Sequence, residues 1–202
     1  MILTEIGEIG VHVGDHCYRL RPSLYAMSKL GSPSEIVSLF ANVMGDPLTK
    51  VHQHSQFRDA LEVIHACTEE DVTEVFGYYN ERFKYVLKKA DPAHIIPLAR
   101  CLLKHGVIGA LPPLPVKSDE DREYTAEFVA RDHVAVAMAH LGVSEAEAWN
   151  MTMTSLVGAL RAKFPQAESD SPGAKAPTIE EAEAALDWHD KVLEKRKKRL
   201  SA

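Results

Sequence analysis

The stretch "HLGVSEAEAWNMTMTSLVGALRAKFP", residues 140–165, decides how the fold of this chain is interpreted. Gly142 is a natural helix terminator, because glycine readily adopts the left-handed conformation at a helix end. Ser144 and Glu147 have the spacing of a capping box, which starts a second helix. Trp149 is expected to pack over the preceding helix. The stretch therefore predicts a compact helical hairpin.

A DNA-binding interpretation of the same stretch has to be weighed, because "LGVS" resembles the turn of a helix-turn-helix. Met138, four residues before Gly142, is bulky and would hold the two helices apart. The second helix presents Glu145 and Glu147 where phosphate contacts would need Arg or Lys. Both features favour the packed hairpin, and a small DNA-binding regulator remains an alternative.

A third helix is expected to follow, over residues 155–163, with Thr152 or Thr154 ending the second helix and capping the third. Residues 165–177 are rich in Ser, Pro, Ala and Gly and predict a flexible linker. Residues 178–202 are charged and helix-prone, with acidic residues at the start and "EKRKKRL" at the end, as the helix dipole favours. The thin apolar stripe of this tail could dock on a partner.

Before the hairpin, three prolines in "GVIGALPPLPVKS" exclude a helix or a central strand. We interpret residues 107–117 as a stiff connector that divides the chain into an N-terminal domain, residues 1–106, and a hairpin module, residues 118–164. The first helix of the module is expected to begin at Ser118 and to stop at Gly142.

The N-terminal domain is predicted to begin with strands. Apolar residues alternate on both sides of the Gly14-Asp15 pair, which is typical of a β-hairpin, and "ILTEI" is a candidate third strand. Helical periodicity then predicts helices at about 24–30, 33–44, 51–66, 72–87 and 92–105, the last ending at Gly106. The predicted fold is mainly α: a helical bundle with a small N-terminal antiparallel hairpin or sheet and a charged C-terminal helix after a flexible linker.

Composition excludes several classes of protein. The net charge of −6 argues against a general nucleic-acid binder. No apolar run approaches the roughly 20 residues that a membrane span needs. The three cysteines form no CxxC pair, which is typical of reduced thiols in the cytoplasm.

Motifs that carry chemistry are lacking in the sequence. Its ten histidines form neither HExxH nor a set of four ligands at zinc spacing. Phosphate-binding GxGxxG and GxxxxGK[ST] loops and the GxSxG nucleophile motif do not occur. We therefore expect no catalytic residue, no cofactor and no metal, although an unrelated enzyme remains an alternative.

"LGVSEAEAWNMTMTSLVGAL" resembles a segment of the tail assembly chaperones of long-tailed bacteriophages. In that family a helix is followed by Leu-Gly, a Ser- and acid-rich cap, an aromatic residue and a Met/Leu-Thr step into the next helix. The opening, residues 18–37, is similar to phage proteins encoded near tail genes. An acidic residue that usually follows the Thr is replaced here by Met153 and Ser155. The matching positions are Leu141, Gly142, Ser144, Trp149, Met151 and Thr152.

The resemblance implies a non-enzymatic, mostly helical protein that keeps the tape measure protein soluble and helps recruit tail tube subunits. It also implies self-association, action in the host cytoplasm and absence from the mature virion. A structural or connector protein retained in the virion is the alternative from the same setting. The candidate partner-binding residues are Trp149, Met151, Thr152, Met153, Leu156, Leu186, Val192 and Leu193.

Overall fold

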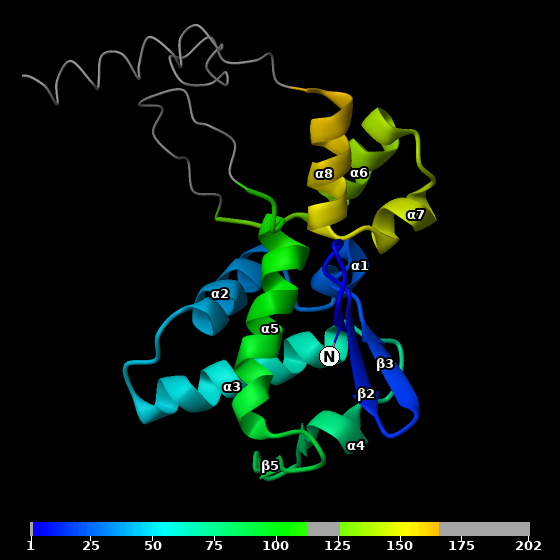
Figure 1. Ribbon diagram of the computed structural model, residues 1–202. Coiled ribbons are helices and arrows are strands. Elements are labelled where there is room, and N and C mark those ends of the chain that lie inside the picture. The colour runs from blue at the N-terminus through cyan, green and yellow to red at the C-terminus, as the bar shows by residue number, and fades with distance from the viewer. Residues whose placement is uncertain (1, 113–125, 166–202) are drawn as a thin grey trace, which may run out of the picture. The chain divides into compact units, whose positions relative to one another are not determined.

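The computed structural model of the protein describes residues 2–112 and 126–165 (Figure 1). Its fold is mainly α-helical, with a small antiparallel sheet at the N-terminus, as the sequence predicts. Met1–Lys163 forms one compact unit, and the chain from Phe164 onward belongs to a second unit. The predicted linker after residue 165, the charged tail helix and residues 113–117 of the Pro-rich connector lie outside the described residues.

The N-terminal sheet consists of β1 (Ile2–Leu3), β2 (Ile9–Val13) and β3 (His16–Leu20), paired antiparallel in the order β1-β2-β3. Gly14 makes the turn between β2 and β3 with a φ of +61°. This conformation suits glycine, because the residue has no Cβ to clash with the backbone. The predicted hairpin and the third strand are both confirmed.

Three capped helices follow the sheet: α1 (Leu24–Ser28), α2 (Pro33–Met44) and α3 (Lys50–Ala66). The Ser23 hydroxyl caps α1 by accepting a hydrogen bond from the Ala26 amide at 3.1 Å. A complete capping box starts α2, as predicted. Helices α1 and α2 therefore begin at their predicted caps. Helix α3 begins after Thr49, whose hydroxyl accepts a hydrogen bond from the His52 amide at 3.2 Å.

The predicted long helix over residues 72–87 is wrong. Only α4 (Thr73–Phe76) is helical, and a second antiparallel pair follows, formed by β4 (Tyr78–Tyr79) and β5 (Tyr85–Val86). We call residues 78–86 the aromatic hairpin. Its apolar residues include five aromatic or β-branched side chains that serve a strand as well as a helix.

Gly77 and Asn80 explain why the helix stops. Gly77 has a φ of +79°, and a Cβ there would lie 2.3 Å from the Val86 carbonyl oxygen, so the close approach of the two segments requires glycine. The Asn80 side chain accepts hydrogen bonds from the Arg82 and Lys84 amides, both at 3.0 Å. Asparagine thereby stabilises a turn in place of a helical continuation.

The helix predicted to end at Gly106 runs further. A 3-10 turn (Pro92–His94) leads into α5 (Ile95–Leu103), and a π-helical turn (Lys104–Ile108) passes through Gly106 and ends at Gly109 with a φ of +82°. A Cβ at Gly106 would lie 2.7 Å from the Met27 sulfur. Gly106 therefore serves close packing against α1 and does not terminate the helix.

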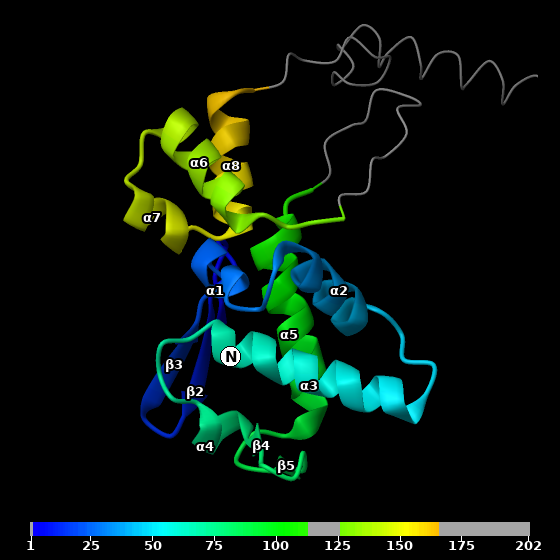
Figure 2. The same ribbon diagram turned by 180° about the vertical axis from the view of Figure 1, so that it is seen from behind.

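The hairpin module contains α6 (Ala130–Leu141), α7 (Glu145–Asn150) and α8 (Met153–Lys163). Figure 2 shows these helices grouped beside α1, in agreement with their contacts. The left-handed Gly142 and the capping box of α7 are confirmed. The predicted start of the first helix at Ser118 lies outside the described residues. Residues 126–129, which the same prediction made helical, are not helical, and α6 begins at Ala130.

One hydrophobic core joins the elements on both sides of the Pro-rich segment. Helices α3 and α5 pack against each other, and Leu102 and Leu103 of α5 are fully buried. Leu156 of α8 and Leu24 of α1 belong to the same core. Because this core contains residues from both sides of the Pro-rich segment, the hairpin module and the N-terminal helices form one packed body. Burial of such side chains is the main favourable contribution to folding.

Candidate functional site

The C-terminal end of α7 contacts the N-terminal end of α1. We call this contact the junction, and it consists of residues 23–25 and 149–152. The Leu24 amide donates to the Met151 carbonyl at 2.8 Å, and Ser23 and Thr152 form an isolated antiparallel bridge. The Thr152 hydroxyl donates to the Ile6 carbonyl at 2.7 Å and accepts from the Ser155 amide at 3.1 Å. Thr152 therefore caps α8 and joins it to the N-terminal sheet region.

Thr154, the other predicted cap, has a different role. It lies inside α8, where its hydroxyl oxygen lies 2.9 Å from Nδ1 of His105 and accepts from the Ala110 amide at 3.0 Å. Burial lowers the pKa of His105, and the positive charge of Lys104 lowers it further to a smaller extent. This polar contact ties α8 to the π-helical turn.

The junction exposes an aromatic pair. The rings of Tyr25 and Trp149 meet edge to face, with centroids 6.3 Å apart. Tyr25 is 51% exposed, and the Lys29 ammonium lies 4.4 Å from the centre of its ring. The Trp149 indole donates to Glu145 at 3.3 Å. Trp149 therefore packs on α1 as well as on its own hairpin, and the pair offers an apolar surface beside a cation.

The predicted partner-binding residues separate into three groups. Thr152, Met153 and Leu156 are at most 4% exposed and support the fold itself. Trp149 and Met151 are partly exposed at the junction. The remaining residues, Leu186, Val192 and Leu193, lie outside the described part of the chain.

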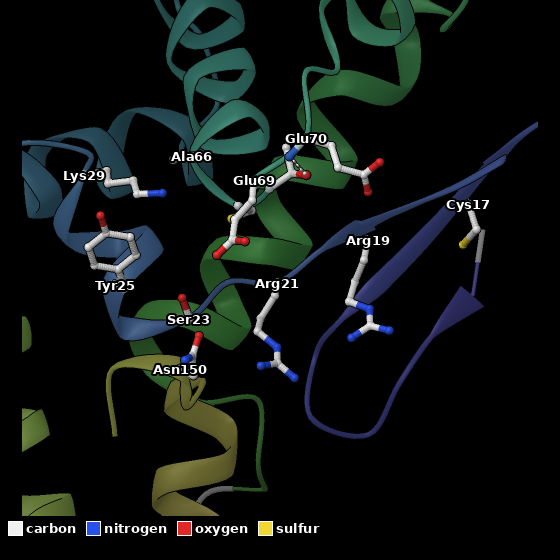
Figure 3. A pocket seen from close by; sticks show the side chains of 12 residues that line it. Cys17, Arg19, Arg21, Ser23, Tyr25, Lys29, Ala66, Glu69, Glu70 and Asn150 are labelled. Atoms are coloured by element: carbon white, nitrogen blue, oxygen red, sulfur yellow. Dashed lines mark hydrogen bonds between the residues drawn. The ribbon is translucent and has the colours of Figure 1, made fainter. Parts of the chain in front are cut away.

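A cavity of about 400 Å³ lies next to this aromatic pair (Figure 3). Tyr25 belongs to both features, and Asn150, which follows Trp149 in the chain, also lines the cavity. The volume falls in the range of small ligand sites. Its lining comes from β3 and the residues that follow it, from α1 and its C-cap, from the end of α3 and the segment after it, and from α7. The residues are Cys17, Arg19, Arg21, Ser23, Tyr25, Lys29, Ala66, Cys67, Thr68, Glu69, Glu70 and Asn150.

The alternation of β3 explains why it supplies Cys17 and Arg19 to the cavity, and Arg21 continues this alternation directly after the strand ends. Successive side chains of a strand point to opposite faces, so these positions share one face. Leu20, on the other face, is fully buried. The Arg21 amide then donates to the Cys67 carbonyl at 2.6 Å, which holds the end of β3 against the end of α3.

Some charged groups of the cavity are already paired and others are not. Arg21 binds Glu8 through Nε, and His16 contacts Glu70 at 2.7 Å. Arg19 and Glu69 form no ion pair within residues 2–112 and 126–165. Burial raises the pKa of the Cys67 thiol, so this lining group is neutral near pH 7.

Sequence reasoning missed this cavity. The sequence signal for it is "CYRLR", residues 17–21, in which the basic residues Arg19 and Arg21 alternate with apolar residues. Within the described residues, no group of three His, Cys, Asp or Glu side chains could hold a metal ion. None of the helices in that part of the chain is long and apolar enough to cross a membrane.

Comparison with known proteins identifies the family of this chain. A model of a family of unknown function (DUF6246) matches residues 20–184, which is most of the chain. The chain belongs to this family. The matched range begins at the last residue of β3 and includes both sides of the junction. No curated protein and no solved structure matches the chain.

Proposed function

We propose that the protein is a non-enzymatic phage tail assembly chaperone that binds the tape measure protein and helps recruit tail tube subunits. In this role it self-associates, acts in the host cytoplasm and is absent from the mature virion. The junction is the observation that carries the proposal. Residues 141–160 resemble a segment of tail assembly chaperones, and residues 18–37 are similar to phage proteins encoded near tail genes. The two stretches meet at the junction through the Leu24–Met151 hydrogen bond.

The surface of the junction has the chemistry of a protein-binding site. Trp and Tyr are enriched among the residues that dominate binding energy in interfaces, because their large rings bury much apolar area. Tyr25 and Trp149 lie together, and Met151, an adaptable apolar side chain, is partly exposed beside them. An amphipathic client helix would place its apolar face on such a surface.

Co-expression with the tape measure protein of the same phage tests the proposal. The wild-type chain is expected to keep that protein in the soluble fraction and to co-purify with it. The double variant Tyr25→Ala/Trp149→Ala is expected to lose most of this effect. Phe83→Ala is the matched control, because Phe83 is an 86% exposed aromatic residue away from the junction.

Circular dichroism of both variants separates loss of binding from loss of folding. A tape measure protein that stays insoluble with the wild-type chain contradicts the proposal. Detection of the chain in purified virions by mass spectrometry also contradicts it and favours the structural or connector role.

A further inference from the structure

We infer that the cavity beside Tyr25 receives an acidic side chain of the client segment whose neighbouring apolar residue packs on the Tyr25–Trp149 pair. This inference rests on the proposed function and specifies the chemistry of the partner. The recognised segment is a helical peptide that carries Asp or Glu three or four residues from a large apolar residue, and Arg19 is the main carboxylate-binding group.

The apolar surface and the cavity are continuous. Tyr25 contributes its ring to the aromatic pair and also lines the cavity. Asn150 lines the cavity directly after Trp149 in the chain, and Lys29 lies at the same rim, over the Tyr25 ring. Two side chains three or four residues apart on one helical peptide share a face and can therefore reach both features.

Arg19 has the properties of a group held ready for a carboxylate. It is exposed, lines the cavity and forms no ion pair with any described residue. Figure 3 shows its guanidinium on the same side of β3 as that of Arg21. A guanidinium binds a carboxylate through two parallel hydrogen bonds, which gives both strength and orientation.

The charge balance of the lining favours a single carboxylate over a phosphate or a nucleic acid. Arg21 is already bound to Glu8, and Glu70 contacts His16. The lining groups without an ion-pair partner among the described residues are two cations, Arg19 and Lys29, and one anion, Glu69. The difference is one positive charge, which a carboxylate neutralises. A phosphate group with two negative charges would be repelled by Glu69, whose carboxylate points into the cavity (Figure 3).

Opposite effects are expected at Arg19 and Glu69 when the full chain is co-expressed with the tape measure protein. Arg19→Gln is expected to lower the retained tape measure protein about tenfold, since charge-assisted bonds to a carboxylate are among the stronger polar contacts. Glu69→Gln removes a repulsive charge and is expected to retain at least as much as wild type. Arg82→Gln, an exposed arginine on the aromatic hairpin, is the control and is expected to behave like wild type.

A scan of overlapping tape measure peptides against the purified full chain then locates the segment. The binding peptide is expected to contain Asp or Glu within four residues of a large apolar residue. Replacing that acid by its amide should weaken binding about tenfold to wild type and hardly at all to Arg19→Gln. Such non-additivity is the signature of a direct contact.

The outcomes distinguish the two proposals. Equal retention by wild type and Arg19→Gln, a binding peptide without an acidic residue, or additive effects of the two changes would overturn this inference and leave the proposed function standing. A wild-type chain that retains no tape measure protein overturns both.

Discussion

The junction and the aromatic hairpin are both built around aromatic rings, but they are held in different ways. Tyr25 and Trp149 belong to distant parts of the chain, and Thr152 beside them bonds to Ile6, 146 residues away. In the aromatic hairpin the Tyr85 ring meets Phe57 at 4.8 Å, and its hydroxyl donates to the Phe76 carbonyl at 2.7 Å. Its polar contacts are therefore local.

This difference predicts that substitutions in the two regions affect stability in different ways. Proteins open in cooperative units, and a contact that joins distant segments supports more than one of them. Loss of a junction contact is expected to lower the free energy of unfolding of the whole compact unit. Loss of a contact within the aromatic hairpin is expected to open that hairpin first and to leave the junction in place.

Thr152→Val is expected to have the largest effect, a loss of about 3 kcal/mol in the free energy of unfolding. Valine has nearly the same shape, but it leaves the Ile6 carbonyl without its donor and removes the cap of α8. Urea unfolding followed by circular dichroism measures the loss. Ser155→Ala, which keeps the capped amide, is the control and should stay within about 0.5 kcal/mol of wild type.

Gly77→Ala tests the aromatic hairpin and is expected to cost about 2 kcal/mol locally. The new Cβ would meet the Val86 carbonyl oxygen, and the φ of +79° is strained for alanine. Gly14→Ala is the matched control, because Gly14 also has a positive φ but no atom within 4 Å of an added Cβ. Hydrogen exchange should show faster exchange in residues 78–86 of Gly77→Ala alone, with the junction amide of Leu24 still protected.

The same comparison explains how much of the fold could be predicted from the sequence. Ser23, Ser32, Ser144 and Gly142 mark helix ends through local chemistry, so those boundaries are readable without a structure. The aromatic hairpin could not be distinguished by periodicity, because its aromatic residues fit a helical stripe equally well. The turn at Asn80 and the close backbone approach of Gly77 to Val86 decide the outcome, and periodicity reveals neither.

The candidate site was predictable only in part. Trp149 and Met151 were recognised from the hairpin pattern, and both are partly exposed at the junction. Thr152 is buried where it bonds to Ile6, and Met153 is buried beside Gly109 at the end of the π-helical turn. No spacing within the hairpin reveals either contact. Arg19 became visible only when β3 and the end of α3 were brought together.

A smaller loss of stability is expected at acidic pH. The two histidines responsible, His105 and His133, lie outside the aromatic hairpin. Burial lowers the pKa of His105, and it also lowers that of His133 on α6, where Asp132 opposes the shift. Below pH 6.5, the ordinary histidine value, the unfolded chain takes up protons that the folded chain resists, so stability falls as the pH decreases. The effect is limited because the Thr154 hydroxyl can accept a hydrogen bond from protonated His105.

Urea unfolding at pH 7 and pH 5.5 measures this dependence. His105→Asn keeps a polar group near Thr154 but does not titrate, so the loss of stability between the two pH values should shrink. His105→Asn/His133→Asn should reduce it further. An unchanged dependence in the double variant would show that these two imidazoles do not cause it.

The smallest effect is expected at Phe83, in the turn of the aromatic hairpin, and it has the opposite sign. Phe83 has a φ of +52° and is 86% exposed, so it combines backbone strain with little packing. Phe83→Gly relieves a strain of about 1 kcal/mol, and the extra freedom of glycine in the unfolded chain offsets roughly half of that gain. A net stabilisation of about 0.5 kcal/mol should therefore appear in urea unfolding.

Two further variants at this position separate strain from packing. Asn tolerates the left-handed region better than Ala, so stability should follow the order Phe83→Gly, Phe83→Asn, Phe83→Ala. If packing of the ring mattered more, all three variants would be less stable than wild type. If the hairpin is a local unit, the stabilisation should slow hydrogen exchange in residues 78–86 and leave exchange at the Leu24 amide unchanged, because that amide bonds to Met151 across the junction.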